Sequence, residues 1–149
     1  MSASESFLLF CTVMCFYCTG ALWMLQIVCY PTYALVGEKE FVPFHVDFGK
    51  RLLIAAVGPM IVTSLATFAL IFARPEAAPL WAALLTAICT AIVLGTTIAI
   101  EVPKHNQLDR DGKSLEVING LVSNNIPRVI CWTLASVTLV YMVVQTFQA

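Results

Sequence analysis

The sequence predicts an all-α membrane protein, a bundle of four transmembrane helices with short interfacial helices in its first and third loops. Composition is the first reason: 60% of the 149 residues are hydrophobic and only 11% are charged, whereas roughly a quarter of a soluble domain is charged. The second reason is that apolar residues gather in four stretches, at 7–30, 52–73, 80–100 and 126–147. About 20 residues cross a bilayer as a helix, and a backbone in lipid must satisfy its own hydrogen bonds. We therefore expect residues 1–149 to form a single integral membrane domain.

The first span, residues 7–30, carries a polar stripe. Residues 1–6 hold no Lys or Arg, so we expect the segment to remain as a span rather than be removed as a signal peptide. The polar residues recur at steps of three and four residues, which places them on one face of a helix. Its members are Thr12, Cys15, Thr19, Trp23, Gln26 and Tyr30. Such a face normally turns toward the bundle interior, although an aromatic belt with one interhelical hydrogen bond from Gln26 is the alternative. Pro31 is expected to end this helix.

The first loop is predicted to hold a short interfacial helix. Its apolar face is set by residues at i, i+3, i+4 and i+7. These are Phe41, Phe44, His45 and Phe48. Gly49 is a natural C-cap, and His45 should point into the protein or the headgroup boundary. In the span that follows, Gly58 and Pro59 should kink the helix.

The third span leads into the most polar part of the chain. Glu101 lies at the expected membrane boundary, on the same face as Thr86, Thr90 and Thr97. Residues 109–113 have the composition of a turn, and Ser114 is expected to cap a short amphipathic helix. Pro127 suits the first turn of the fourth span. Around it, residues at i, i+3 and i+7 stack on one face, namely Asn125, Arg128 and Trp132.

The distribution of basic residues predicts the orientation in the membrane. Arg74 lies between the second and third spans. The other basic residues lie in or beside the first and third loops: Lys39, Lys50, Arg51, Lys104, Arg110, Lys113 and Arg128. Because positively charged loops stay in the cytoplasm, we expect a multi-pass protein of the inner (plasma) membrane. Its first and third loops would be cytoplasmic, and both termini would be outside.

The unusual polar and aromatic side chains lie near one end of the predicted bundle. Helices joined by short loops pack side by side, so we expect these residues to surround a cytoplasm-facing polar mouth over an apolar cavity. They are Gln26, Tyr30, His45, Arg51, Glu101, His105, Asn106, Asn124, Asn125 and Arg128.

Three interpretations of this polar end stay open. In the first, His45 and His105, together with Glu101 or Asp47, bind haem or a divalent metal such as iron or zinc. In the second, no cofactor takes part: a histidine acts as general base, and Asn, Gln or Arg side chains hold an oxyanion of an apolar substrate. In the third, the groups are structural and tie the helix ends together through hydrogen bonds and ion pairs.

Several motifs, spread over nearly the whole chain, carry a family resemblance. They are Trp23-x-x-Gln26-x-x-x-Tyr30-Pro31, His45 in the first loop, Arg51, Pro103-x-His105-Asn106-x-Leu108, and Asn125-x-x-Arg128-x-x-x-Trp132-Thr133. The chain thereby resembles small bacterial four-helix membrane proteins of unassigned function and, more distantly, the DUF1772, anthrone oxygenase-like family. The resemblance implies a four-helix membrane fold. It also implies oxygenation of a polyketide anthrone to a quinone without a metal or flavin.

Together these observations predict an oxygenase or oxidoreductase that acts on a hydrophobic aromatic small molecule without a cofactor. His105 would accept a proton, and Asn106 and Arg128 would orient the reacting groups. The substrate-binding residues would be Trp23, Gln26, Tyr30, His45, Glu101, Asn125 and Trp132. The alternative is a non-catalytic structural or accessory subunit, in a homo-oligomer or a larger membrane complex. The net charge of -1 argues against nucleic acid as a partner, because nucleic-acid binding needs a basic surface.

Overall fold

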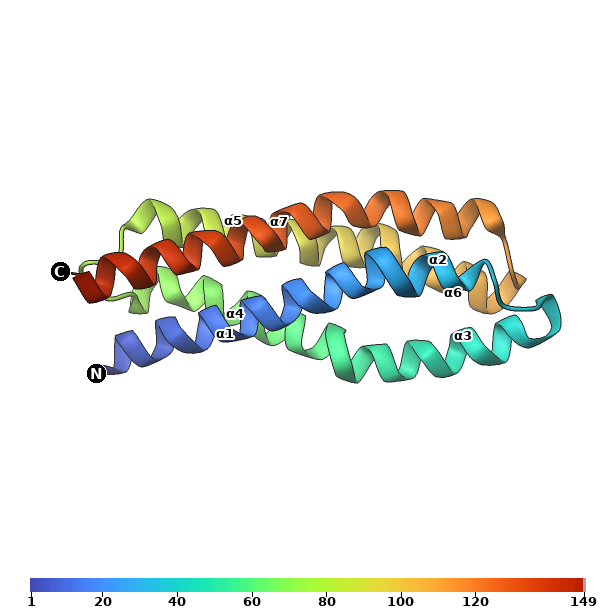
Figure 1. The fold of residues 1–149 in the computed structure, drawn as a ribbon, viewed down its shortest axis with the longest axis horizontal. Helices are drawn as coiled ribbons and strands as arrows, with labels where there is room; N and C mark the ends of the chain where they lie inside the picture. The colour runs from blue at the N-terminus through green and yellow to red at the C-terminus, as the bar shows by residue number, and fades with distance from the viewer. Residues whose placement is uncertain (149) are drawn as a thin grey trace.

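The computed structural model describes residues 1–148, which form four long antiparallel helical columns and, within that range, no strand (Figure 1). The columns span Ala3–Tyr33, Glu38–Ala73, Leu80–Asp111 and Leu115–Gln148, and each is long and apolar enough to cross a membrane. The first column begins and the fourth column ends at the same end of the bundle (Figure 1). The predicted all-α architecture with four membrane-spanning helices is confirmed.

Three of the columns change helix type part-way along their length. In a π-helical segment (η), hydrogen bonds join residues five apart instead of four. In chain order the elements are α1 (Ala3–Met24), η1 (Leu25–Cys29), α2 (Tyr30–Tyr33), α3 (Glu38–Leu52), η2 (Leu53–Val57), α4 (Gly58–Ala73), α5 (Leu80–Thr96), η3 (Thr97–Glu101), α6 (Val102–Asp111) and α7 (Leu115–Gln148). Contacts join α1 to α7, α7 to α5, α5 to α4 and α4 to α1, so the columns close into a ring around one core.

Each π-helical segment is followed by a proline, and the proline accounts for it. The residue before Pro31, Pro59 or Pro103 donates its N–H to the carbonyl five residues back. The donor and acceptor residues are Tyr30 and Leu25, Gly58 and Leu53, and Val102 and Thr97. Proline lacks an N–H, and its ring clashes with the carbonyl four residues earlier; a widened turn relieves both conflicts. The first column therefore continues past Pro31 to Tyr33, beyond the predicted end.

The short interfacial helices predicted in the first and third loops are not confirmed as separate elements. The residues expected in the first of them belong to α3, which continues through η2 into α4. Gly49 lies inside α3 instead of capping a helix, because an interior glycine costs only about 1 kcal/mol relative to alanine. The helix after Ser114 likewise continues through Pro127 as α7. Both segments thus extend the membrane helices beyond their apolar stretches.

The first and third loops are held against each other. Gly112 ends α6 with a φ of 84°, a left-handed conformation that side-chain-bearing residues rarely adopt. The next residue, Lys113, donates from Nζ to the carbonyl oxygens of Ala34 at 2.8 Å and Val36 at 2.6 Å. These carbonyls follow α2, so the lysine fixes the end of the first column beside the start of the fourth.

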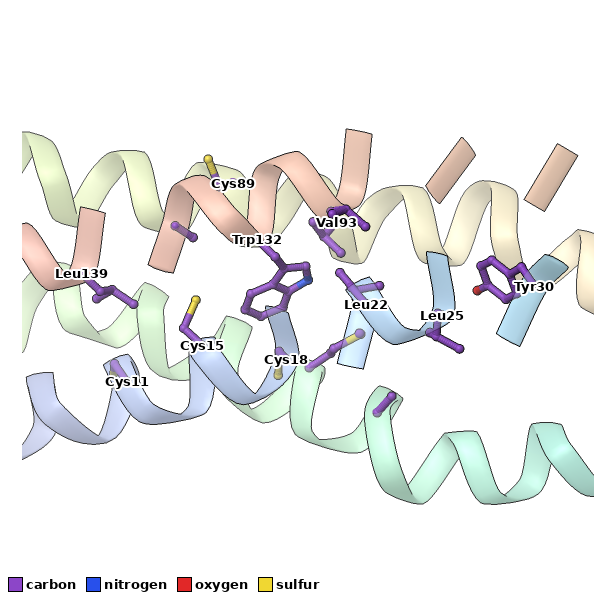
Figure 2. Close-up of a cluster of buried hydrophobic side chains, with 14 of the residues drawn as sticks. Cys11, Cys15, Cys18, Leu22, Leu25, Tyr30, Cys89, Val93, Trp132 and Leu139 are labelled. Carbon is purple, nitrogen blue, oxygen red and sulfur yellow. The ribbon is translucent and has the colours of Figure 1, made fainter. Parts of the chain in front are cut away.

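Apolar and sulfur side chains fill the middle of the bundle. Figure 2 shows Trp132 of α7 directed toward α1, where Cys15, Cys18 and Leu22 belong to the same buried cluster. All four side chains are fully buried. Large apolar side chains also cover the outside, and Phe72, for example, is 80% exposed. An outer surface of this kind is what contact with lipid requires.

Candidate functional site

The candidate site lies at the end of the bundle opposite the chain termini. We call this region the polar end; it consists of α2, α3, α6, the three π-helical segments and the first turns of α7 (Figure 1). In this region α3 packs on α6, and α2 packs on α7. The first and third loops, which hold most of the charged residues, therefore meet at one place.

Two histidines and an aspartate form a hydrogen-bonded chain, which we call the histidine chain (Asp109, His45 and His105). The His45 Nδ1 lies 2.6 Å from the Asp109 Oδ1, and the His45 Nε2 lies 3.0 Å from the His105 Nδ1. The two imidazole rings are stacked, with centroids 5.1 Å apart. The ring of His45 is only 1% exposed, whereas the Asp109 side chain is 39% exposed. The chain thus runs from the protein surface to the interior.

The order of donors and acceptors in this chain follows from its first member. A carboxylate only accepts hydrogen bonds, so the His45 Nδ1–H donates to Asp109. The Nε2 of a neutral His45 is then an acceptor, and it receives the Nδ1–H of His105. This arrangement leaves a lone pair on the Nε2 of His105, which is the arrangement of a general base whose orientation is set by two further groups.

Aromatic rings shield the histidine chain. Phe41 stacks on His45 with centroids 5.5 Å apart, and Tyr33 meets the same imidazole edge-on at 5.1 Å. Tyr30 lies 5.8 Å from the ring of His105. Because these neighbours exclude water from most of the two imidazoles, the hydrogen bonds in the chain act in a low-dielectric environment, where they are stronger than in water.

An inner cavity of about 60 Å³ borders His105. It is lined by Leu25, Tyr30, Leu52, Ala56, Val57, Met60, Thr97, Glu101, Val102, His105 and Arg128. The lining draws on all four columns, and a residue from each π-helical segment contributes to it. The lining is mostly apolar but includes a few polar side chains, and a cavity of this size beside polar groups can hold a water molecule or a small polar group.

Glu101 and Arg128 face this cavity as a loose buried ion pair. They are 2% and 3% exposed, and Arg128 Nη1 lies 3.7 Å from Glu101 Oε2, too far for a hydrogen bond. Among residues 1–148, both Glu101 oxygens and the Arg128 Nε have no hydrogen-bond partner. Leaving a buried polar atom unpaired costs about 1–3 kcal/mol, and more for a charged group. The pair therefore has unused capacity to bind something in the cavity.

A hydrogen-bonded network holds Arg128 in place. Its Nη1 donates to Asn125 Oδ1 at 2.9 Å, and Asn125 Nδ2 donates to Gln26 Oε1 at 3.0 Å. Gln26 Nε2 in turn donates to the carbonyl oxygen of Val122 at 3.1 Å. Gln26 and Asn125 thus connect η1 to α7 and act on the cavity through Arg128, instead of lining it.

Most of the predicted site residues do come together at this place. Tyr30, Glu101, His105 and Arg128 line the cavity. His45 reaches it through His105, and the two amides reach it through Arg128.

Three predicted residues lie elsewhere. Trp23 is 45% exposed on the outside of α1, where its Nε1 donates to Thr133 Oγ1 at 3.2 Å. Trp132 is fully buried in the middle of the core (Figure 2). Asn106 is exposed on α6 and is not part of the cavity lining. Trp23 and Trp132 were suggested by i+4 and i+7 spacings, which continue the helical faces but not the cavity. Asn106 was suggested by its place next to His105 in the motif Pro103-x-His105-Asn106-x-Leu108.

Two further residues of the site, Asp109 and Tyr33, were not expected from the sequence. Asp109 follows His105 by four residues on α6, a spacing that brings two side chains to one face of a helix. This spacing could have placed Asp109 beside His105 from the sequence. Tyr33 follows Tyr30 by three residues, but the helix was expected to end before it. The hydroxyl of Tyr33 is buried and, within the described part of the chain, has no hydrogen-bond partner.

The alternative of a metal site has a limited set of ligands. In the range 1–148, no group of three or more His, Cys, Asp and Glu side chains is arranged to hold a metal ion. Both ring nitrogens of His45 are engaged in the histidine chain, so His105 Nε2 is the imidazole nitrogen left for a ligand.

Comparisons with protein-family models, curated proteins and solved structures found no match to this chain.

Proposed function

We propose that this protein is a membrane enzyme that oxidises a hydrophobic aromatic small molecule with dioxygen, without a cofactor, at the cytoplasmic side of the inner membrane. The observation that carries the proposal is the histidine chain. It supplies a base, His105 Nε2, at the edge of a mostly apolar cavity, and two groups that orient this base. The resemblance to anthrone oxygenase-like proteins points to the same chemistry.

The proposed reaction converts an activated methylene into a carbonyl: R₂CH₂ + O₂ → R₂C=O + H₂O. His105 takes the first proton from the methylene carbon, and the aromatic rings of the substrate delocalise the resulting anion. The anion adds to dioxygen, and the protonated His105 returns its proton to give a hydroperoxide. His105 then takes the second carbon-bound proton, and the electron pair of the C–H bond forms the carbonyl as the O–O bond breaks. The expelled hydroxide takes that proton from His105 and leaves as water. Carbon is oxidised and dioxygen is reduced, so the equation balances.

The other polar groups assist the charges that develop. Arg128 stabilises an oxygen anion at the cavity wall, which is the contribution of a preorganised cationic donor. Asp109 stabilises the positive charge on the two imidazoles, and the chain of hydrogen bonds lets a proton pass from His105 through His45 toward the surface. This division of labour is that of a base supported by an orienting carboxylate.

A non-catalytic subunit is the second candidate, and the network of Gln26, Asn125 and Arg128 favours it. These side chains join α7 to the first column with hydrogen bonds of 2.9 to 3.1 Å. Buried polar residues of this kind can serve helix packing alone. Under this function, changes at His105 would leave the phenotype intact, and bulky residues on a lipid-facing surface would disrupt assembly with a homo-oligomeric or other membrane partner.

Hydrogen exchange on a model substrate tests the proposal. The purified protein in lipid nanodiscs is incubated with anthrone in D₂O under nitrogen, and deuterium incorporation at the methylene carbon is followed by mass spectrometry. Without oxygen, this reaction reports proton abstraction alone; with oxygen, formation of anthraquinone reports the complete reaction. We expect His105→Ala to lower both rates by roughly 10²–10⁴-fold, the contribution of a general base.

The control is Gln107→Ala, an exposed position two residues away on α6, which should leave both rates unchanged. Wild-type exchange no faster than that of His105→Ala would overturn the proposal. So would a stoichiometric metal or a haem absorption band that His105→Ala removes, because metal chemistry would then replace the cofactor-free reaction.

A further inference from the structure

An apolar groove on the outer face of the bundle lies next to the inner cavity. Its volume is about 590 Å³, and it runs between the first column and the junction of α3 with η2. It is lined by Phe16, Tyr17, Gly20, Ala21, Met24, Leu25, Cys29, Phe48, Arg51, Leu52, Ala55 and Ala56. Eleven of these twelve side chains are uncharged, and Arg51 is the exception. A groove on this face of a membrane helix bundle opens toward lipid.

Small residues and a cross-helix hydrogen bond shape the groove. Gly20 and Ala21 on α1 lie along one side, and Ala55 and Ala56 on η2 lie along the other. Their small side chains leave room for a flat molecule. The Tyr17 hydroxyl spans the two sides by donating to the carbonyl oxygen of Ala55 at 2.7 Å, so the groove is a built feature and the helices do not separate freely there.

The groove and the inner cavity share a wall. Leu25, Leu52 and Ala56 line both spaces. Leu25 and Ala56 are buried, whereas Leu52 is half-buried and carries a flexible side chain. Rotation of the Leu52 side chain is therefore the smallest movement that would join the two spaces, and rotamer changes of this kind take picoseconds to nanoseconds where the side chain is free.

The unpaired atoms behind this wall specify the ligand chemistry. The oxygens of Glu101 can only accept a hydrogen bond while the carboxyl is ionised, and the Nε–H of Arg128 can only donate. Within residues 1–148, neither side chain finds a hydrogen-bond partner for these atoms. A hydroxyl group satisfies both at once, because it donates one hydrogen bond and accepts another. A ligand with an apolar body and a hydroxyl end therefore matches the groove and the cavity together.

We propose that a lipid-soluble aromatic molecule bearing a hydroxyl group reaches the site from the bilayer through this groove. Its rings occupy the space between α1 and η2, and its hydroxyl binds between Glu101 and Arg128. The assignment names the substrate class and the access route for the same site, so it rests on the proposed function for the role of His105. The binding step is nevertheless measurable without any turnover.

Two probe molecules with the same rings test the hydroxyl. Tritiated 2-naphthol binds to the wild-type protein in nanodiscs, and unlabelled 2-naphthol or 2-methoxynaphthalene competes with it. The methoxy compound cannot donate a hydrogen bond. We expect it to bind roughly tenfold to a hundredfold more weakly, the range for a hydrogen bond to a charged group. Glu101→Gln should bring the two affinities close together, mainly by weakening 2-naphthol.

A matched pair of substitutions tests the groove. Ala55 lines the groove and is exposed, and Ala91 is exposed on α5 outside the groove. Ala55→Phe should fill the groove and weaken both naphthalene compounds at least tenfold, whereas Ala91→Phe should leave both affinities unchanged. Thermal unfolding of each variant confirms that the bundle is intact. Equal effects of the two substitutions would overturn the access route, and equal wild-type affinities for the two probes would overturn the hydroxyl site.

The outcomes also separate this inference from the proposed function. If binding follows the expected pattern but the wild-type protein exchanges no methylene hydrogen, the hydroxyl site stands and the enzymatic function fails. If His105-dependent exchange occurs while Ala55→Phe and Glu101→Gln bind both probes like the wild type, the function stands and this inference fails.

Discussion

Most buried polar groups in the half of the bundle near the chain termini bond to their own helices or to each other, whereas Glu101 and Arg128 in the polar end retain unused hydrogen-bonding capacity. Among the described residues, the indole Nε1 of Trp132, in the middle of the core, is an exception outside the polar end. Thr86 Oγ1, for example, donates to the Ala82 carbonyl at 2.9 Å, and the hydroxyls of Thr67 and Thr90 lie 2.9 Å apart. By contrast, both oxygens of Glu101 are buried and, as far as residues 1–148 go, have no hydrogen-bond partner.

The same boundary separates regular from widened helix. All three π-helical segments of the described chain lie in the polar end, and each contributes to the inner cavity. π turns inside α-helices often occur at functional sites. We therefore infer a different role for each part: the half near the termini serves mainly for helix packing, and the polar end is where we propose that a further molecule binds.

The largest expected effect concerns the ion pair that marks this difference. Arg128→Ala leaves the buried Glu101 without a counter-charge and should lower the free energy of unfolding by about 3–5 kcal/mol. Thr90→Val, in the other half, removes a hydroxyl that bonds to the Ala87 carbonyl oxygen at 3.1 Å and to the Thr67 hydroxyl at 2.9 Å. The loss of the interhelical bond should cost about 0.6 kcal/mol. Equilibrium unfolding in mixed micelles measures both. Replacing both members of the pair, in the double variant Glu101→Leu with Arg128→Met, should recover most of the lost stability. Similar losses of stability in Arg128→Ala and Thr90→Val would contradict the contrast between the halves.

A second prediction concerns the prolines. Pro103→Ala allows η3 to close into a regular α-turn, which displaces His105 relative to His45. A displacement of about 1 Å costs roughly a hundredfold in rate, so exchange of anthrone hydrogens should fall by this factor while the bundle stays folded. Pro127→Ala is the control, because Pro127 lies inside α7, for which no π-helical segment is described up to Gln148. Equal rates in the two variants would show that the widened turn does not position the base.

A third, smaller effect is expected at the surface end of the histidine chain. Asp109→Asn keeps an acceptor for His45 Nδ1–H but removes its charge, so the exchange rate should fall by roughly tenfold, the equivalent of about 1.4 kcal/mol. Asp111→Asn is a matched control on the same helix, because Asp111 pairs with the exposed Arg110 at 2.7 Å and does not touch the chain. If Asp111→Asn slowed exchange as much as Asp109→Asn, a general effect of charge would explain the result instead.

The last prediction concerns the orientation of the polar end in the membrane, and its two substitutions should leave the activity unchanged. Gln107→Cys and Ala77→Cys place thiols at exposed positions at opposite ends of the bundle. If the loops with most Lys and Arg are cytoplasmic, a membrane-impermeant maleimide should label Ala77→Cys in intact spheroplasts and Gln107→Cys only after lysis. The reverse pattern would put the polar end on the outer side.

Much of the fold could be predicted from the sequence, because its dominant signal is hydrophobic length. The four apolar stretches each correspond to one helical column. The prolines were harder to interpret, since Pro31 stops a regular helix but can be accommodated by a π turn. The extensions of α3 and α7 beyond the apolar stretches were likewise missed, because Gly49 and Pro127 are weak signals inside a continuous helix.

The candidate site was predictable where one helix determines it and unpredictable where two helices meet. Tyr30, Glu101, His105 and Arg128 were expected near one another because each lies at the same end of its helix. The hydrogen bond between His45 and His105 depends on how α3 packs on α6, which no spacing within either segment reveals. Trp23 was placed in the site because it continues the polar stripe of α1, but the stripe is wider than the interface that it covers.

The widened turns also bear on how this chain would differ from its relatives. A π turn holds one residue more than an α-turn, and adding or removing a residue in a helix rotates everything beyond it by about 100°. Single-residue insertions and deletions in homologous chains should therefore fall within 25–29, 53–57 and 97–101 as well as in the loops. Each such insertion or deletion would rotate the part of its helix that lies in the polar end. The rest of that helix would keep the same side chains facing lipid. Lineages could thus acquire new sites on an unchanged membrane anchor.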